Sequence, residues 1–320
     1  MILKPIHSLE EYTEKAEPLL GVFASKKWLS VYGDSLKIIG IYKDEHQLIG
    51  GFYFLNAKKY SFNFMKLPPY TPHCGLFYVS ESKNNSSANS FSKEVITEVC
   101  NYISNQKNVL TILAFPSTVI DLQPFIWGKY KVIPNYTYRI NLLQSMETIK
   151  GNFDSKNRNV INKALKDGVQ VSTNSMDKLK LYDFFNHSLA SANANIYHEE
   201  LKNIFLKFSD NSNSFDIVAS RGEEILGCVF CIYDKNTCYY LLGGVDKGSG
   251  VNGVNNLLVQ QSIEKAKELN CQVFDFEGSM LKGVEKFFRS FGPELVPYYT
   301  VNKASLLIEL LLKFKKRELF

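Results

Sequence analysis

The stretch "YYLLGGVDKGSGVNGVNNLLVQQSIEKAKELNCQVFDFEGSM", residues 239–280, decides the fold of this chain. An apolar strand runs into a loop that contains five glycines, and an amphipathic helix follows almost at once. Residues 271–278 then resume a strand that ends in carboxylates and a glycine. This order predicts a strand, loop, helix and strand of an α/β protein.

The glycine-rich loop is a candidate anion site. Glycine lets the main chain approach a ligand closely, and the exposed N–H groups at the start of a helix favour phosphate or a developing negative charge. We therefore expect Gly248, Gly250, Val251 and Gly253 to bind an anionic donor. The alternative is a plain connecting loop, because the spacing matches neither the P-loop nor the dinucleotide fingerprint.

The strand end at "FDFEG" supplies candidate acid–base residues. Alternation along a strand should bring Asp275 and Glu277 to one face, and ligands of open sheets gather at the carboxyl ends of strands. A carboxylate there can take a proton from an attacking amine. The alternatives are a buried ion pair or a cap for the next helix, and Ser279 fits an N-cap better than a catalytic hydroxyl.

The following segment, "KGVEKFFRSFGPELVPYY" (residues 282–299), predicts an aromatic helix packed on the sheet. Arg289 lies among three phenylalanines, and an always-charged guanidinium beside an apolar wall suits an anionic transition state or a phosphate. The alternative is a solvated arginine.

Composition places the chain among ordinary globular proteins. Its 320 residues are 45% hydrophobic and 22% charged, and the net charge of +5 favours an anionic partner such as a nucleotide, a tRNA or an acidic lipid surface without choosing among them. The opening residues do not resemble a signal peptide, and no apolar run is long enough to span a membrane. We therefore expect a cytoplasmic protein.

Metal binding is not expected. Cys228 and Cys231 form a C-x-x-C, but the strand period of "ILGCVFCIYD" points positions three apart to opposite faces. The six cysteines are scattered, mostly in apolar segments, and the histidines lack companions at metal-ligand spacing.

The order of predicted elements recurs in both halves of the chain. Helices are followed by a meander of short strands and then by a loop, a helix and a further strand. We interpret this as a duplicated mixed α/β unit, with domains at residues 1–142 and 143–320.

Several motifs resemble the FemABX group, in which two GNAT N-acyltransferase folds are fused. The similarity covers nearly the whole chain. The matching stretches are "SKKWLSVYGD" (residues 25–34), "LPPYTPHCGLFY" (67–78), "SKNRNVINKALKDGVQV" (155–171), "FDFEG" (274–278) and "VEKFFRSFGPELVPYY" (284–299). The resemblance implies two tandem GNAT-like folds, each a mostly antiparallel mixed sheet flanked by helices.

The resemblance also implies transfer of an acyl or aminoacyl group to an amine of a cell-envelope sugar or peptide precursor, small or lipid-linked. Glu277 or Asp275 would accept the proton, Arg289 would stabilise the oxyanion, and Phe288 would contact the donor. Tyr70 and Tyr197 would bind the acceptor. The donor stays open between acyl-CoA and aminoacyl-tRNA, because the loop lacks the Q/R-x-x-G-x-G/A pattern and no coiled-coil arm is evident.

Two further expectations concern partners. The segment "ASLLIELLLKFKKRELF" (residues 304–320) combines leucines with a basic cluster, which predicts either an amphipathic helix on an anionic membrane or a helix packed on the second fold. The rival to an enzyme is a tandem fold that binds without turnover, as a scaffold in envelope or polysaccharide assembly.

Overall fold

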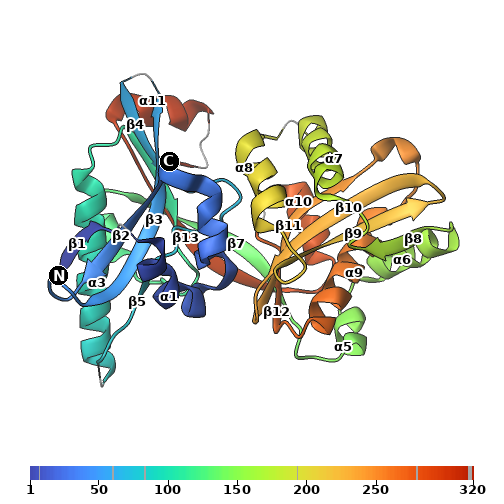
Figure 1. Ribbon diagram of the computed structural model, residues 1–320, viewed down its shortest axis with the longest axis horizontal. Coiled ribbons are helices and arrows are strands. Elements are labelled where there is room, and N and C mark those ends of the chain that lie inside the picture. Colours follow the sequence, from blue (N-terminus) through green and yellow to red (C-terminus); the bar gives the residue numbers. More distant parts are fainter. Residues whose placement is uncertain (7, 60, 83, 193, 279, 316–318) are drawn as a thin grey trace. The chain divides into compact units, whose positions relative to one another are not determined.

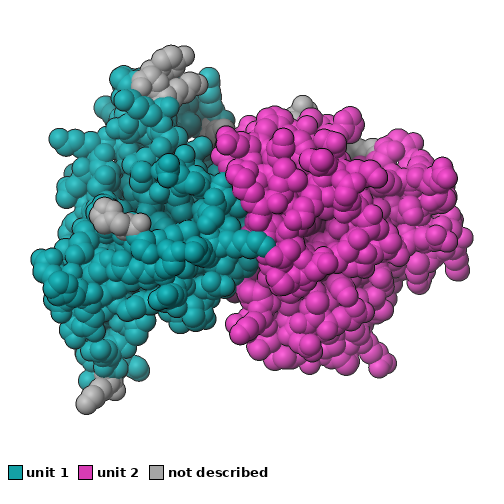
Figure 2. Space-filling model, viewed as in Figure 1, with its two compact units in different colours: residues 1–135, 297–320 teal, residues 136–296 magenta. Residues whose placement is uncertain are grey.

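The computed structural model describes residues 1–6, 8–59, 61–82, 84–192, 194–278, 280–315 and 319–320. The chain divides into two compact units, which Figure 2 colours separately. Unit 1 comprises residues 1–135 and 297–320, and unit 2 comprises residues 136–296. The predicted Ser279 cap lies outside the described residues.

Unit 1 contains the elements of the first part of the chain together with its last strand and helix (Figure 1). Its strands are β1 (Ile2–Pro5), β2 (Leu36–Tyr42), β3 (Leu48–Lys59), β4 (Phe62–Lys66), β5 (Phe77–Tyr78), β6 (Leu110–Ala114) and most of β13 (Glu294–Ala304). Its helices are α1 (Leu9–Leu20), η1 (Gly21–Ala24), α2 (Lys26–Leu29), η2 (Ser30–Ser35), α3 (Asn85–Asn105), α4 (Gln123–Trp127) and α11 (Leu306–Lys315).

The unit 1 sheet has the order β1-β2-β3-β4-β6-β13, with β5 beside β3. All neighbouring pairs are antiparallel except β4 and β6, which run parallel over three residues. One face packs on α3 through Val95 and Val99. On α2, Trp28 is fully buried and donates its indole N–H to Thr71 Oγ1 at 3.0 Å.

Helix α3 begins earlier than the sequence predicts. Residues 81–90 are polar enough to suggest a surface loop, yet the helix starts at Asn85. The Asn84 side chain accepts a hydrogen bond from the N–H of Ser87 and so caps the helix. Capping chemistry outweighs the low hydrophobicity of this stretch.

Unit 2 holds the stretch that opened the sequence analysis. Its strands are β7 (Lys131–Asn141, from residue 136), β8 (Gln170–Thr173), β9 (Ser214–Arg221), β10 (Glu224–Tyr233), β11 (Thr237–Val245) and β12 (Val273–Asp275). Its helices are α5 (Met146–Gly151), α6 (Ser155–Lys166), α7 (Lys178–Ser191), α8 (His198–Asn203), the π-helix η3 (Ile204–Phe208), η4 (Lys247–Ser249), α9 (Val254–Glu268) and α10 (Lys282–Arg289).

The unit 2 sheet has the order β7-β12-β11-β10-β9-β8 and lies between two layers of helices (Figure 1). Helices α6, α9 and α10 bury Ile161, Leu257 and Phe288 against one face. On the other face Phe185 of α7 stacks on Phe205 of η3, which contacts Phe230 of β10. Again a single pair, β11 and β12, is parallel, so both units are mostly antiparallel mixed sheets, as predicted.

The unit boundaries differ from the predicted domains 1–142 and 143–320. Strand β7 passes from unit 1 into unit 2 at residue 136, and residues 297–320 return to unit 1. The reason is main-chain pairing: Thr300 to Ala304 of β13 pair antiparallel with Ala114 to Leu110 of β6. Strand partners far apart in sequence cannot be recognised from local periodicity.

A buried asparagine ties three helices of unit 2 together. Asn157 of α6 is 2% exposed, and its Nδ2 donates to the carbonyl oxygen and the hydroxyl of Ser290, which ends α10. Its Oδ1 accepts from Nδ2 of Asn256 on α9 at 2.9 Å. Both the Nδ2 and the Oδ1 group of Asn157 therefore form hydrogen bonds between the helices of this layer.

We predict that Asn157→Ala destabilises the protein by about 2–4 kcal/mol, because it leaves several buried polar groups without partners. Asn159→Ala is the matched control, since Asn159 is an exposed residue of the same helix and its truncation should change the free energy of unfolding by about 0.5 kcal/mol or less. Urea denaturation measures both. Equal effects of the two substitutions would contradict this account.

Candidate functional site

The parallel strands β11 and β12 stay together only briefly. Residues 237–239 pair with residues 273–275, whereas β11 continues along β10 as far as Val245. Leu241 is skipped in the β10 register, because Tyr240 pairs with Cys231 and Leu242 with Phe230. Such a bulge bends a strand. The second half of β11 therefore has an edge that β12 does not cover.

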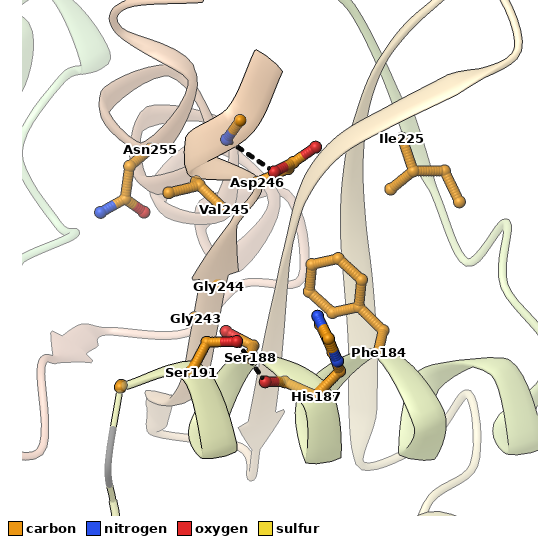
Figure 3. A pocket seen from close by; sticks show the side chains of 12 residues that line it. Phe184, His187, Ser188, Ser191, Ile225, Gly243, Gly244, Val245, Asp246 and Asn255 are labelled. Atoms are coloured by element: carbon orange, nitrogen blue, oxygen red, sulfur yellow. Dashed lines mark hydrogen bonds between the residues drawn. The ribbon is translucent and has the colours of Figure 1, made fainter. Parts of the chain in front are cut away.

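A cavity of ≈ 570 Å³ lies at the end of β11 (Figure 3). Helix α7 forms one wall with Phe184, His187, Ser188, Ser191 and Ala192. Gly243 and Gly244 of β11 form another wall, and Asn255 in the first turn of α9 lies beyond them. The size is typical of a small-molecule site.

Glycine is required where β11 passes α7. A Cβ on Gly244 would lie 2.3 Å from Oγ of Ser188, and a Cβ on Gly243 would lie 1.6 Å from the Tyr240 hydroxyl. Glycine inside a strand often marks a place where a ligand or another segment of the backbone comes close. Here the space beside Gly244 is filled by Ser188 of α7, and the space beside Gly243 is filled by the Tyr240 hydroxyl.

The glycine-rich loop is organised by its own side chains. Asp246 accepts a hydrogen bond from the N–H of Gly248 at 2.8 Å, so this amide is already engaged (Figure 3). Gly250 and Gly253 have positive φ angles, and a Cβ on Gly253 would lie 2.2 Å from the Val160 carbonyl oxygen. Gly248 lines the cavity, whereas Val251 packs partly against the core. Turn geometry and helix packing thus account for most of these glycines.

Asp275 is held by an ion pair and by hydrogen bonds to both of its oxygens. It is 4% exposed, and its Oδ2 accepts from Arg139 Nε at 2.7 Å on the neighbouring strand β7. Its Oδ1 accepts from Thr137 Oγ1 at 2.5 Å and from the N–H of Glu277 at 2.8 Å. Both oxygens are occupied, as the alternative of an ion pair expects, and the catalytic role of Asp275 stays a prediction.

Glu277 lies in a different environment two residues later. Its φ angle of 60° breaks the strand alternation, and no hydrogen bond to its buried Oε1 is found among the described residues. Burial raises the pKa of this carboxyl well above its usual value, and the negative charge of Asp275 raises it further. Glu277 is not among the residues that line the cavity beside α7.

Arg289 and Phe288 do not reach this cavity. The Arg289 side chain is 62% exposed and forms an ion pair with Glu285 one turn earlier, with Nε to Oε1 at 2.7 Å. Phe288 is a core residue whose ring centre lies 4.6 Å from that of Phe276. The structure therefore gives both residues packing and ion-pair contacts in place of the predicted donor contacts.

The predicted acceptor residues belong to different units. Tyr70 lies in unit 1, in the turn between β4 and β5, with a φ angle of 61°. Tyr197 lies in unit 2, partly exposed, and its carbonyl accepts from the N–H of Leu201 at the start of α8. Their role in acceptor binding stays a prediction.

The sequence reasoning missed the contribution of α7. Helix α7 spans Lys178–Ser191, and only the structure shows that its Ser188 and Ser191 face β11. The available signal was Gly243 and Gly244 inside a strand, since glycines there indicate a close neighbour. Which helix supplies that neighbour depends on the tertiary structure.

The cysteines behave as small apolar residues. Cys228 pairs with Gly244 and Cys231 with Tyr240, on opposite faces of β10 as predicted. Burial raises the pKa of the Cys228 thiol well above its ordinary value, which disfavours the thiolate. Within the described ranges, no group of His, Cys, Asp and Glu side chains could hold a metal ion.

Comparison with known proteins identifies the domain. Residues 155–289 match the family model described as an acetyltransferase (GNAT) domain. No curated protein sequence matches the chain.

Solved structures agree with the fold over the whole chain. FemX superposes with a TM-score of 0.63 at 11% identity, covering 98% of this chain and 99% of FemX. L-PGS from Bacillus licheniformis gives 0.57 at 12% identity, with 95% and 96% covered. A tandem GNAT protein from the clavulanic acid biosynthesis pathway gives 0.55 at 6% identity, with 94% and 98% covered. The chain therefore has the tandem fold seen in FemX and in the tandem GNAT protein, and its residues 155–289 match the GNAT domain model.

Proposed function

We propose that the protein is an N-acyltransferase that moves an acyl or aminoacyl group from an activated donor to an amine of a cell-envelope sugar or peptide precursor. The observation that carries this proposal is the cavity along the open edge of β11, inside the GNAT domain. Gly243 and Gly244 lie in its wall at positions where a larger side chain would not fit.

An acyl-CoA thioester is the donor that we favour over aminoacyl-tRNA. The cavity matches a small molecule in volume, and the amphipathic wall of Phe184, Ser188 and Ser191 suits an arm with alternating apolar and amide groups. Aminoacyl-tRNA remains the alternative, because its acceptor end is also a small group on an extended chain. The two donors are distinguished by direct binding.

The reaction joins the amine nitrogen of the acceptor to the carbonyl carbon of the donor. The tetrahedral intermediate then collapses and expels the thiolate, or the ribose oxygen of a tRNA donor. The attacking nitrogen must lose a proton. Glu277 is the carboxyl of the predicted pair with a buried oxygen left for this role, and because it does not line the cavity the proton would reach it through water. Burial raises the pKa of Glu277, which makes its ionised carboxylate a stronger proton acceptor than an ordinary glutamate.

One observation favours the rival function, a scaffold that binds ligands without turnover. Of the three predicted catalytic groups, Asp275 is fully engaged with Arg139 and Thr137, and Arg289 pairs with Glu285. A protein that retained the cavity but not the chemistry would bind donor or acceptor and release no free thiol. Turnover assays with the bound donor separate the two functions.

We predict that Ser191→Trp weakens acyl-CoA binding at least tenfold, because Ser191 lines the cavity and its replacement by a large ring would fill the space. Ala190→Trp is the matched control, since Ala190 is the preceding exposed residue of α7 and lies outside the cavity lining. Calorimetric titration with acetyl-CoA and with aminoacyl-tRNA measures both. Equal affinities of the two variants would exclude this cavity as the donor site.

We predict that Glu277→Gln lowers kcat by about 10²- to 10⁴-fold and leaves donor affinity unchanged. In the wild type, activity should rise with pH as Glu277 loses its proton, at a pH above the ordinary glutamate value because the pKa is raised. The pH profile of Glu277→Gln should lack this rise in activity. A wild-type profile that shows no rise at any pH above the ordinary glutamate pKa, or a variant profile with the same rise, would remove Glu277 from the mechanism.

We also predict that Glu277→Gln stabilises the fold at neutral pH. The folded state holds the Glu277 proton more tightly than the unfolded state, so wild-type stability falls as pH rises between the unfolded and folded pKa values, by at most about 1.4 kcal/mol per pH unit. The extra stability of Glu277→Gln over the wild type should therefore vanish near pH 4, which is about the pKa of a glutamate in the unfolded chain. Exposed Glu223→Gln is the control and should show no such pH dependence in thermal unfolding.

A further inference from the structure

Helix α11 presents an apolar surface to solvent. None of its residues is buried, and five large apolar side chains are between 46% and 89% exposed: Leu306, Leu307, Leu310, Leu311 and Phe314. A soluble protein seldom leaves so many large side chains uncovered on one short helix. This group is called the α11 stripe below.

The five side chains share one face of the helix. At 100° per residue they fall within an arc of about 140°. Ile308 and Leu312 are half-buried and occupy the opposite side. The α11 stripe therefore points away from the surface on which the helix rests.

Positive charge borders the α11 stripe. On the helical projection Lys313 lies at one edge of the stripe and Lys315 at the other, and both are exposed. Glu309 is the acidic residue of α11, and it pairs with Lys313 at 2.8 Å. An apolar face bordered by lysines is the pattern of a helix that lies in the interface of an anionic bilayer.

A neighbouring hairpin extends this surface. The N–H of Ser305, just before α11, donates to the carbonyl of Val109, and the N–H of Val109 donates to the carbonyl of Asn63 in β4. Phe62, the first residue of β4, is 51% exposed at this end of the sheet. Lys58, which pairs with Asn63, is also exposed. Both apolar and basic groups therefore continue from α11 onto the hairpin.

We propose that α11 binds the surface of a membrane rich in anionic phospholipids, with the α11 stripe among the acyl chains and its lysines at the lipid phosphates. The helix must lie in the plane of the bilayer, because its ten residues span about 15 Å and a bilayer core is about 30 Å thick. None of the helices in the described parts of the chain is long and apolar enough to cross a membrane. This inference is independent of the proposed catalytic function.

Flotation of the full-length protein with lipid vesicles tests the proposal. The vesicles contain phosphatidylcholine alone or phosphatidylcholine with phosphatidylglycerol. The stripe variant Leu307→Glu, Leu311→Glu, Phe314→Glu removes the α11 stripe at exposed positions. The control Leu19→Glu, Ile120→Glu, Ile126→Glu makes the same change in charge at exposed apolar positions elsewhere in unit 1.

The wild type and the control should float with phosphatidylglycerol vesicles, whereas the stripe variant should bind at least about 100-fold more weakly. Lys315→Gln should weaken binding about fivefold, and added salt should weaken it further. The proposal is overturned if the wild type floats equally well with neutral and with anionic vesicles. It is also overturned if the stripe variant floats as well as the wild type. A third outcome also overturns it: the wild type does not bind vesicles but forms a dimer, and the stripe variant does not. The α11 stripe would then be an interface with a second copy of the chain.

Discussion

The ion pair between Asp275 and Arg139 determines where the unit 2 sheet divides. It joins β12 to β7 at the last residue of β12, and the remaining Asp275 oxygen holds the Thr137 hydroxyl and the next turn of chain. Asp275 is buried, and the ion pair together with two further hydrogen bonds compensates its charge, so these contacts fix its position. Because β12 is held to β7 here, the second half of β11 is left without β12 as a partner, and the cavity beside α7 lies at its end.

The two carboxyls of "FDFEG" illustrate how environment assigns roles. Asp275 accepts three hydrogen bonds that stabilise its charged form, whereas Oε1 of Glu277 is buried beside that charge. The sequence alone presents them as equivalent candidates, because strand alternation would place both on one face. The positive φ angle of Glu277 breaks that alternation, and a residue other than glycine in this region is not expected from local pattern.

Much of the fold was predictable because its signals are local. The amphipathic period of α9, the stop after α6 at Gly168 and the C-x-x-C faces of β10 depend only on neighbouring residues. The cavity was not predictable, because Ser188 and Gly244 are brought together by packing of α7 on the sheet. The packing of Phe288 on the sheet was predicted, whereas its contact with a donor stays a prediction, because an aromatic residue at helical spacing fits a ligand wall and a core equally well.

The return of β13 to the first unit has a consequence for how the chain folds. Unit 2 is one continuous segment, so all its strand partners are present once residue 296 has left the ribosome. The edge of β6 in unit 1 receives β13 only after that whole segment has been synthesised. Pairing between such distant segments is slow because the loop must close first, and an uncovered strand edge can associate with other chains meanwhile. The nascent first unit is thus the part of this protein with the greatest need of chaperone protection.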